Sequence, residues 1–302
     1  MTSDSPGARS GDRPGPDLLR YAAFTGDPAG GNPAGIVLDA TGLDDAAMLA
    51  VAAGVGYSET AFVTEAAADP AERRFRLRYF SPLAEVDFCG HATVATSVAL
   101  AERLGAGPLV FDTAAGEIAV DTALATAEDG AGPVATLTSV PTRSRPAEPT
   151  EVGAALAALR WEAADLDPVL PPHVAFGGND HLVLAAGTRA RLAALDYDFD
   201  ALGDLMRRRG WTTVHLVWRE PGDGRVFHAR DPFPVGGVVE DPATGAATAA
   251  FGGYLRELGL VREPTRFRLR QGEDMGRPSD LRLDVSPDSP RVRVTGHAVP
   301  IA

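Results

Sequence analysis

The sequence contains one cysteine, Cys89, among 302 residues, so it cannot form an internal disulfide or a zinc site built from several thiolates. A chain without disulfides fits the reducing cytoplasm, which is the compartment that we expect for this protein. The sequence also lacks an apolar run approaching the roughly 18 residues of a membrane-spanning helix. We therefore expect a soluble, cytoplasmic protein that has no membrane partner.

Positive charge is scarce as well. The chain has 28 Lys and Arg residues against 41 Asp and Glu residues, a formal net charge of -13 and a pI near 4.9. Nucleic acids and anionic membranes are bound by clustered Lys and Arg, so we exclude both as partners. The composition, 45% hydrophobic and 23% charged, is that of a globular protein. The length suits about two domains of the usual ~150 residues.

The distribution of polar segments predicts how the chain is divided. Residues 1–17, rich in Ser, Gly, Pro and Asp, are expected to form a disordered leader. A polar, Gly-rich stretch at 125–132 separates a first half, residues 18–130, from a second half, residues 131–289. The C-terminal strand within 290–302 is a candidate to return to the first half.

Two segments of the chain resemble each other. Asp231–Leu255 and Asp87–Gly105 each run from an acidic residue through a glycine, Gly245 or Gly90, into a helix of small apolar residues. Helices that are apolar on every face belong in a protein core. Their first turns carry unpaired N–H groups and a partial positive charge, which suit an organic anion. The pattern predicts a duplicated half with two helix N-termini facing one cleft; the alternative is two unrelated Ala-rich helices.

The remaining elements predict the fold class. Many short segments alternate in polarity, as Phe75–Phe80 and Thr265–Gln271 do, which is the period of a half-buried strand. Only two long apolar helices accompany them, whereas a doubly wound fold would have a helix after each strand. We therefore predict an α+β fold in which sheets wrap around helices.

Three residues are candidates for chemistry, and each has a simpler alternative. Glu59 lies at the mouth of an apolar strand, where it could donate and accept a proton; the alternative is a solvated turn residue. His91 lies at the start of a core helix and could project into the cleft, or could instead form a helix-cap hydrogen bond. Asp241, held extended by Pro242, could orient an ammonium or imidazolium, or merely complement the helix dipole.

Other patterns argue against a cofactor and a metal. The Gly-rich loop Gly30–Gly35 is not followed by Lys-Ser/Thr or by a helix start, and Gly54–Gly56 is too short for a dinucleotide fingerprint. The other histidines have no metal-site spacing. A triad of Ser58, His91 and Asp241 can be drawn, but the strand-turn-helix elbow that would expose the serine is missing. Arg78 and Arg230 are candidates to balance the buried acids.

Four phrases, in this order, resemble the phenazine-biosynthesis PhzF-like family, relatives of diaminopimelate epimerase. They are GNPAGIV at 31–37, SETAFV at 58–63, RYFSPLAEVDFCGHAT at 78–93 and EDPATGAA at 240–247. The resemblance implies a diaminopimelate-epimerase-like fold of two pseudo-symmetric halves, each a mixed sheet rolled around one central helix. It also implies an active site between the halves and a homodimer.

The resemblance also implies roles for residues of this sequence. Glu59 matches the family's acid/base glutamate, while His91 and Asp241 match residues that hold and polarise the substrate. In the family's best-known member the reaction is isomerisation of trans-2,3-dihydro-3-hydroxyanthranilate, without metal or coenzyme. The residues that we predict to bind substrate are Gly90, Gly245, Ala246, Ser58 and Asn32.

Two departures from the family pattern limit the prediction. Ala246 stands where the phenazine isomerase carries serine, so one hydrogen bond to that substrate is missing. Cys89 stands where epimerase relatives place their first catalytic thiol, but without a second cysteine a two-thiol epimerase is excluded. We interpret Cys89 as a small buried hydrophobe.

The leading hypothesis is a cofactor-independent isomerase that moves a proton on a small cyclic amino or imino carboxylic acid. One alternative is a non-catalytic protein that binds a small acid or a partner on the same scaffold. The other is a hydrolase or lyase that uses Glu59 to activate water.

Overall fold

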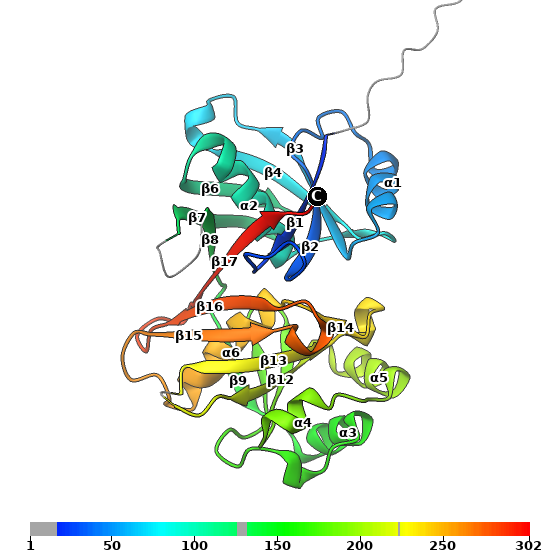
Figure 1. Ribbon diagram of the computed structural model, residues 1–302, viewed down its shortest axis with the longest axis vertical. Coiled ribbons are helices and arrows are strands. Elements are labelled where there is room, and N and C mark those ends of the chain that lie inside the picture. Colours follow the sequence, from blue (N-terminus) through cyan, green and yellow to red (C-terminus); the bar gives the residue numbers. More distant parts are fainter. Residues whose placement is uncertain (1–16, 126–131, 223) are drawn as a thin grey trace, which may run out of the picture.

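The computed structural model describes residues 17–125, 132–222 and 224–302, which form two lobes, shown one above the other in Figure 1. The first lobe contains β1 (Leu18–Ala23), β2 (Asn32–Val37), α1 (Asp45–Val55), β3 (Glu59–Ala66), β4 (Arg74–Phe80), β5 (Glu85–Val86), α2 (Gly90–Leu104), β6 (Gly107–Thr113), β7 (Gly116–Leu124) and β8 (Pro133–Thr138). The second lobe contains β9 (Arg143–Pro146), α3 (Pro149–Leu159), β10 (His173–Phe176), β11 (Asp180–Ala185), α4 (Arg189–Ala193), α5 (Phe199–Arg209), β12 (Trp211–Arg219), β13 (Val226–Pro232), β14 (Glu240–Asp241), α6 (Gly245–Glu257), β15 (Thr265–Gln271) and β16 (Ser279–Val285). The last strand, β17 (Arg293–Pro300), joins both lobes.

The strands of the first lobe close into a barrel around α2. The hydrogen-bonded order is β1, β2, β3, β4, β6, β7, β8 and β17, and β17 pairs again with β1. Pairs β2–β3 and β4–β6 are parallel, and the others are antiparallel. Residues 91–101 of α2 are buried, which explains why the sequence of this helix has no polar face.

The second lobe repeats this pattern of pairing strand by strand. Its order is β9, β10, β11, β12, β13, β15, β16 and β17. When β10 is matched with β1, the parallel pairs β11–β12 and β13–β15 correspond to the parallel pairs β2–β3 and β4–β6. The two-residue strands β5 and β14 also correspond. Each lies directly before the core helix of its lobe and pairs with the preceding strand, β4 or β13. The duplication predicted from the two helical segments is therefore present in the topology.

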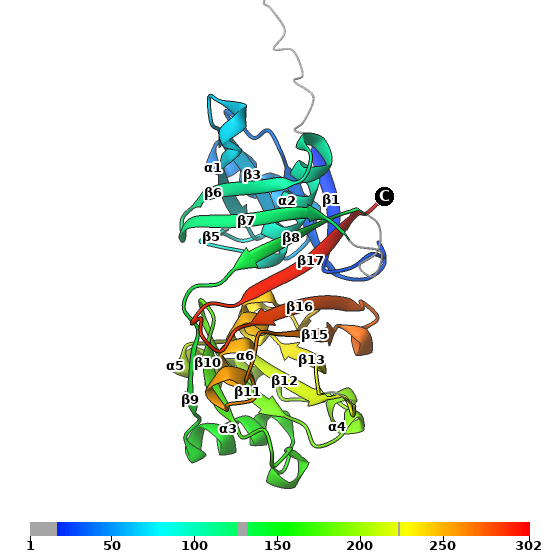
Figure 2. The same cartoon turned by 90° about the vertical axis from the view of Figure 1, so that its left-hand side faces the viewer.

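The C-terminal strand β17 lies between the lobes (Figure 2). It pairs with β16 of the second lobe and with β8 and β1 of the first. Strand β8 pairs with β7 and contacts α2, although the division at 130/131 assigns it to the second half. Two chain segments, before β9 and before β17, thus connect the lobes.

Most predicted elements occur with small changes in their ends, and a few were missed. Strand β15 has the predicted bounds, and α2 and α6 begin at the predicted glycines, Gly90 and Gly245. Strand β9 was not predicted, because its Arg-rich sequence at the sheet edge does not alternate. Strand β2 begins at Asn32, inside a Gly/Pro-rich segment at 26–33 whose composition indicates a turn. None of the described helices combines the length and the apolar character that a membrane-spanning helix requires.

The close approach of β10 to α6 gives a first testable prediction. A Cβ atom at Gly177 would lie 2.5 Å from the backbone nitrogen of Ala250 and 2.8 Å from the carbonyl oxygen of Ala246. Because backbone atoms of a packed helix cannot move aside as a flexible side chain can, Gly177→Ala should lower the free energy of unfolding by about 3 kcal/mol. Urea denaturation measures this change.

The control for this prediction is Gly153→Ala, within α3. A Cβ atom at Gly153 meets nothing within 4 Å, so alanine should raise the stability by about 0.5–1 kcal/mol through its higher helix propensity. Equal stability of Gly177→Ala and wild type would show that α6 does not pack this closely on β10.

Candidate functional site

The candidate site lies where the two core helices approach each other. Helices α2 and α6 contact one another, and Gly90 and Gly245, their first residues, are only partly buried. A Cβ atom at Gly90 would meet only an atom of Phe88, at 3.9 Å, so the space before α2 is open. The helix starts therefore offer backbone N–H groups to a small molecule.

Three chemically different side chains meet beside the start of α2. The Oε2 atom of Glu59, at the start of β3, lies 3.5 Å from Nε2 of His91 and 3.5 Å from Sγ of Cys89. The sulfur is 3.3 Å from Nδ1 and 3.8 Å from Nε2 of His91. The Glu59 side chain is 19% exposed and that of His91 is 8% exposed. The structure thus brings Glu59 to His91. Both side chains are largely shielded from solvent, and Glu59 keeps part of its surface exposed.

Burial controls the protonation of two members of this group. Desolvation lowers the pKa of His91, opposed by the charge of Glu59 and a hydrogen bond with the Pro33 backbone, so the neutral imidazole is favoured. Desolvation raises the pKa of Cys89 well above its usual value, the charge of Glu59 adds to this, and the Ala92 N–H opposes it. Both groups are therefore uncharged near neutral pH, because burial opposes protonation of His91 and deprotonation of Cys89.

Asp241, on β14, is held by one residue from each lobe. Its Oδ1 accepts a hydrogen bond from Nδ2 of Asn32 at 2.7 Å, and its Oδ2 accepts one from Oγ1 of Thr244 at 2.5 Å. Desolvation raises the pKa of Asp241 to about 8, with contributions from the charges of Asp231 and Glu59, while the Thr244 and Asn32 hydrogen bonds lower it. Asp241 thus contacts the first lobe through Asn32, and the charge of Glu59 is one of the causes that raise its pKa.

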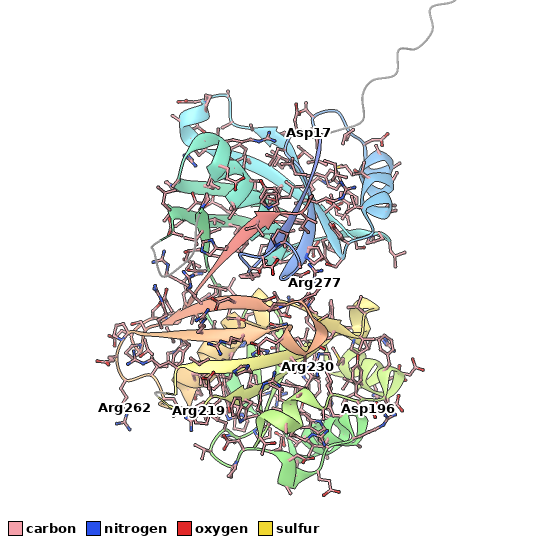
Figure 3. All side chains as sticks on the ribbon, viewed as in Figure 1. Asp17, Asp196, Arg219, Arg230, Arg262 and Arg277 are labelled. Carbon is pink, nitrogen blue, oxygen red and sulfur yellow. The ribbon has the colours of Figure 1, made fainter. Side chains whose placement is uncertain are left out.

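Asn32 and Arg277 join the lobes around this site. The Asn32 amide, 1% exposed, also donates to the Ala243 carbonyl at 3.2 Å. From the second lobe, Arg277 donates to the carbonyl oxygens of Gly31 and Gly30 at 2.8 and 2.7 Å, and Figure 3 shows it at the boundary between the lobes. Asn32 therefore contacts Asp241 in this structure, and its contact with substrate stays a prediction.

Two positioning residues were missed by the sequence analysis. Gln271, at the end of β15, donates to the Asp241 carbonyl at 2.7 Å and to Thr244 Oγ1 at 3.0 Å, and accepts from the Thr244 N–H at 3.0 Å. Thr244 in turn uses its hydroxyl on Asp241 and makes no side-chain cap on α6. Nothing local in the sequence marks Gln271, because its partners lie 27 and 30 residues away.

Other expected members of the site lie elsewhere. Arg230 forms a buried ion pair with Glu240, as expected for an arginine that balances a buried acid. The Glu240 carboxylate is therefore bound to Arg230 and does not join Glu59. Arg78 pairs with Glu85 and Asp45 at an exposed position, so it does not balance the acids of the site.

Ser58 reaches the site, but the triad drawn from the sequence is not assembled. Its Oγ atom lies 3.5 Å from Nε2 of His91. His91 is directed to Glu59 and Cys89, while Asp241 is engaged by Asn32 and Thr244. The same nitrogen of His91, Nε2, faces both Ser58 and Glu59, so the ring does not link Ser58 to a carboxylate through its two nitrogens as a nucleophilic triad requires.

Comparison with known proteins agrees with this architecture. A closed barrel and a second sheet of matching topology, each around a core helix, define the α+β diaminopimelate-epimerase-like fold. The sequence profile of the PhzC-PhzF family, phenazine biosynthesis-like proteins, matches residues 21–302, and the chain belongs to this family. The family resemblance inferred from the four phrases is confirmed.

Individual relatives define the class of enzyme. The uncharacterized isomerase YddE of Salmonella typhimurium is 32% identical over 296 residues, covering 94% of this chain and 96% of the relative. The trans-2,3-dihydro-3-hydroxyanthranilate isomerase of Pseudomonas aeruginosa is 29% identical, covering 86% of each chain. A PhzF-family phenazine biosynthesis protein structure from Bacillus anthracis superposes with a TM-score of 0.83, at 26% identity, over 94% of this chain and 96% of the other. The chain is an isomerase of this family.

Proposed function

We propose that the protein moves a proton between two positions of a small cyclic amino or imino carboxylic acid, with Glu59 as the acid/base. The observation that carries the proposal is the contact of Glu59 with neutral His91 at 3.5 Å, beside the open start of α2. A carboxylate so placed can accept a proton from carbon and return it to another carbon of the same molecule.

The helix starts supply the binding half of the mechanism. The substrate carboxylate lies against N–H groups of Gly90, Gly245 and Ala246, where the dipoles of both helices stabilise a negative charge. Asp241 accepts a hydrogen bond from the amino or imino group. Neutral His91 has one donor and one acceptor nitrogen and polarises the substrate beside Glu59. Together these contacts fix which carbon faces Glu59.

The ring size and substituents of the substrate are part of the same proposal. The Pseudomonas relative acts on trans-2,3-dihydro-3-hydroxyanthranilate, an amino acid with a conjugated ring. At the second residue of α6 this chain has Ala246, which offers no side-chain hydrogen bond. We propose a substrate of the same class that does not require a hydroxyl at this position.

Proton exchange with solvent tests the proposed function. The full chain is incubated in deuterated water with a set of cyclic amino and imino acids, and carbon-bound deuterium is followed by NMR and mass spectrometry. Deuterium entering one ring carbon, with isomerised product of otherwise unchanged mass, supports the proposal. Cleavage products without carbon-bound label would instead show a hydrolase or lyase, and tight binding without exchange would show a binding protein.

Gln271→Leu should slow this proton exchange, although we place Gln271 behind Asp241 and Thr244 and not in contact with the substrate. The variant removes the amide that holds Thr244 and the Asp241 backbone, so Asp241 loses its fixed orientation. Misplacement of an orienting group by about 1 Å costs about 100-fold, and we expect a loss in kcat of this order. Steady-state kinetics and the pH profile measure it.

The matched control is Arg268→Gln on the same strand. Arg268 pairs with Asp280 on the exposed face, so its variant should keep wild-type kinetics. If both variants had wild-type kcat and the same pH profile, Gln271 would not position Asp241.

A further inference from the structure

The Glu59, Cys89 and His91 side chains have a second chemical capacity. Among the residues that the structure describes, they form the one group of three such side chains whose ligand atoms all lie within 4.8 Å of one another. A carboxylate oxygen, a sulfur and an imidazole nitrogen are the three kinds of ligand that Zn²⁺ takes in proteins. The mixed set, rather than any one of these residues, is what merits a test for metal binding.

The separations of the three atoms match the edges of a zinc tetrahedron. With Zn–S near 2.3 Å, Zn–N near 2.0–2.1 Å and Zn–O near 2.0–2.2 Å, tetrahedral angles give edges of about 3.6 Å for S···O and S···N and about 3.4 Å for N···O. The structure has 3.5 Å from Sγ to Oε2, 3.8 Å from Sγ to Nε2 and 3.5 Å from Nε2 to Oε2. Each edge agrees within about 0.2 Å, but Sγ also lies 3.3 Å from Nδ1, so the imidazole must turn for Nε2 and Sγ to bind one metal ion.

The surroundings of His91 supply an independent indication. His91 hydrogen-bonds to the Pro33 backbone, the contact that metal-binding histidines commonly make with their second nitrogen. With three protein ligands, one coordination position stays open, as in zinc sites that exchange water or a substrate.

We propose that Glu59, Cys89 and His91 form a site for one Zn²⁺ ion, and that zinc bound there inhibits the enzyme. On binding, the Cys89 thiol gives its proton to the buffer and the thiolate bonds to zinc; nothing is oxidised or reduced. The Glu59 oxygen that would accept the substrate proton becomes a zinc ligand, and the open position lies where the substrate would enter. Binding rests on the geometry of the three side chains alone, whereas inhibition rests on the proposed role of Glu59.

A group of one histidine and two acids in the second lobe provides a matched control. His228 lies between two carboxylates, with Nδ1 2.6 Å from Glu273 and Nε2 3.1 Å from Glu220. It has a histidine and two acids but no thiol, and both ring nitrogens are already engaged. His228→Ala tests whether any bound metal is held by this group.

The experiment uses the full chain freed of metal by a chelator and then titrated with Co²⁺ and with Zn²⁺ in the absence of substrate. Wild type and His228→Ala should bind one Co²⁺ with a thiolate-to-cobalt charge-transfer band, which one equivalent of Zn²⁺ abolishes. Cys89→Ser should lose the band and bind Zn²⁺ about 100-fold more weakly, and Glu59→Gln should bind it at least about 10-fold more weakly. Zinc should also raise the Tm of wild type, a measurement that does not depend on the variants folding.

Other results would overturn the proposal. A wild-type protein without the thiolate band and without a zinc-dependent rise in Tm does not have the site. The same applies if the band is lost in His228→Ala. Zinc binding with undiminished proton exchange would keep the metal site and refute the inhibition, and because metal binding is measured without substrate, its failure would leave the proposed function standing.

Discussion

Glu59→Gln should lower the rate of carbon-bound proton exchange by about 10³-fold or more. The amide has nearly the same shape as the carboxylate but cannot accept a proton from carbon, and general acid/base groups contribute about 10²–10⁴-fold. Because burial disfavours the charged forms of both His91 and Cys89, neither should replace Glu59 as the proton acceptor beside the open start of α2. The measurement is the initial rate of deuterium incorporation at saturating substrate.

Two further variants give this result its meaning. Glu59→Asp keeps the carboxylate but withdraws it by one methylene, so it should retain part of the activity that Glu59→Gln loses. Glu65→Gln, on the same strand at a side chain 71% exposed, should leave the rate unchanged. Equal rates for wild type and Glu59→Gln would remove Glu59 from the mechanism.

Asp241→Asn should raise the stability of the protein at alkaline pH and lower its activity. The folded protein raises the pKa of Asp241 from 3.8 to about 8, so between these values it holds this proton more tightly than the unfolded chain does. The stability linked to this proton is fully present below about pH 4 and is lost as pH rises through about 8. The variant cannot ionise and avoids this loss.

The expected result is a pH-dependent gain in stability. Relative to wild type, the free energy of unfolding of Asp241→Asn should rise between pH 4 and pH 8, reaching a few kcal/mol (~2–4) at the alkaline end. Activity should fall, because asparagine carries an N–H group in place of one of the carboxyl oxygens that can accept a hydrogen bond. Urea denaturation at several pH values measures the first effect, with Asp121→Asn, whose partner Arg293 lies at the surface, as the control. A stability difference that does not change with pH would contradict the buried position of Asp241.

The sequence was most informative where chemistry and periodicity agreed. The glycines at the starts of α2 and α6 were identified because each lies a few residues after an acidic residue and directly before a helix of small apolar residues. The structure buries most of both helices. The alternating strand β15 was predicted with its observed bounds. The duplicated fold followed from comparing the two helical segments, since related sequences fold into related units.

Contacts between distant segments could not be predicted in the same way. The bond from Asn32 to Asp241 joins residues 209 positions apart, and Gln271 reaches Thr244 from a separate strand. Cys89 is buried in the hydrophobic core, as interpreted, and its thiol also contacts Glu59 and His91. No spacing rule contains such information, because it depends on how separate strands and helices pack within each lobe and, for Asn32 and Asp241, on how the two lobes pack together.

The histidines of the second lobe make the same point. They were interpreted as scattered core or surface residues, but His181 and His215 belong to one buried network. Thr213 donates to Asp231 at 2.8 Å and contacts His181 at 2.8 Å, while His215 lies 3.0 Å from Asp231. Strands β11, β12 and β13 are neighbours in the sheet, which brings together residues that the sequence separates.

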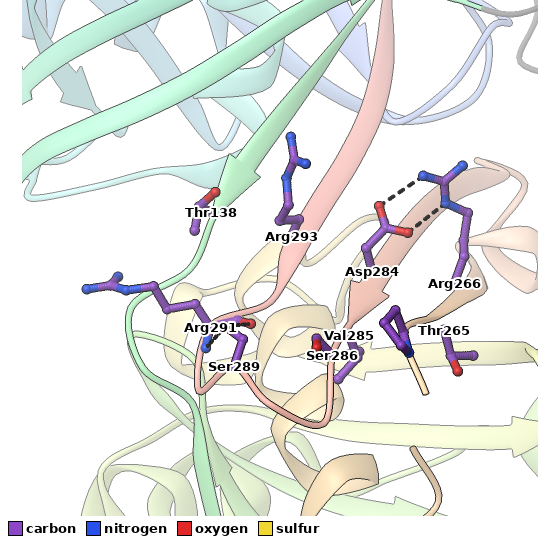
Figure 4. Close-up of a pocket in the computed structure, with 10 residues that line it drawn as sticks. Thr138, Thr265, Arg266, Asp284, Val285, Ser286, Ser289, Arg291 and Arg293 are labelled. Atoms are coloured by element: carbon purple, nitrogen blue, oxygen red, sulfur yellow. Dashed lines mark hydrogen bonds and ion pairs between the residues drawn. The ribbon is translucent and has the colours of Figure 1, made fainter. Parts of the chain in front are cut away.

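A cavity away from the candidate site offers a competing place for a small acid. It has a volume of about 480 Å³, lies among β8, β15, β16 and β17, and is lined by Arg266, Arg291 and Arg293 (Figure 4). Arg266 there is paired with Asp284, and Arg293 with Asp121. The cavity has arginines for an anion but no unpaired acid beside a histidine, so the proposed proton transfer has no base there.

The most direct test of the account is a crystal structure of the protein with a substrate or a stable cyclic imino acid bound. We predict its carboxylate at the starts of α2 and α6, with a Glu59 oxygen within about 3.5 Å of a ring carbon and the amino or imino nitrogen toward Asp241. An acid bound only in the arginine-lined cavity of Figure 4, with Glu59 out of contact, would contradict the account.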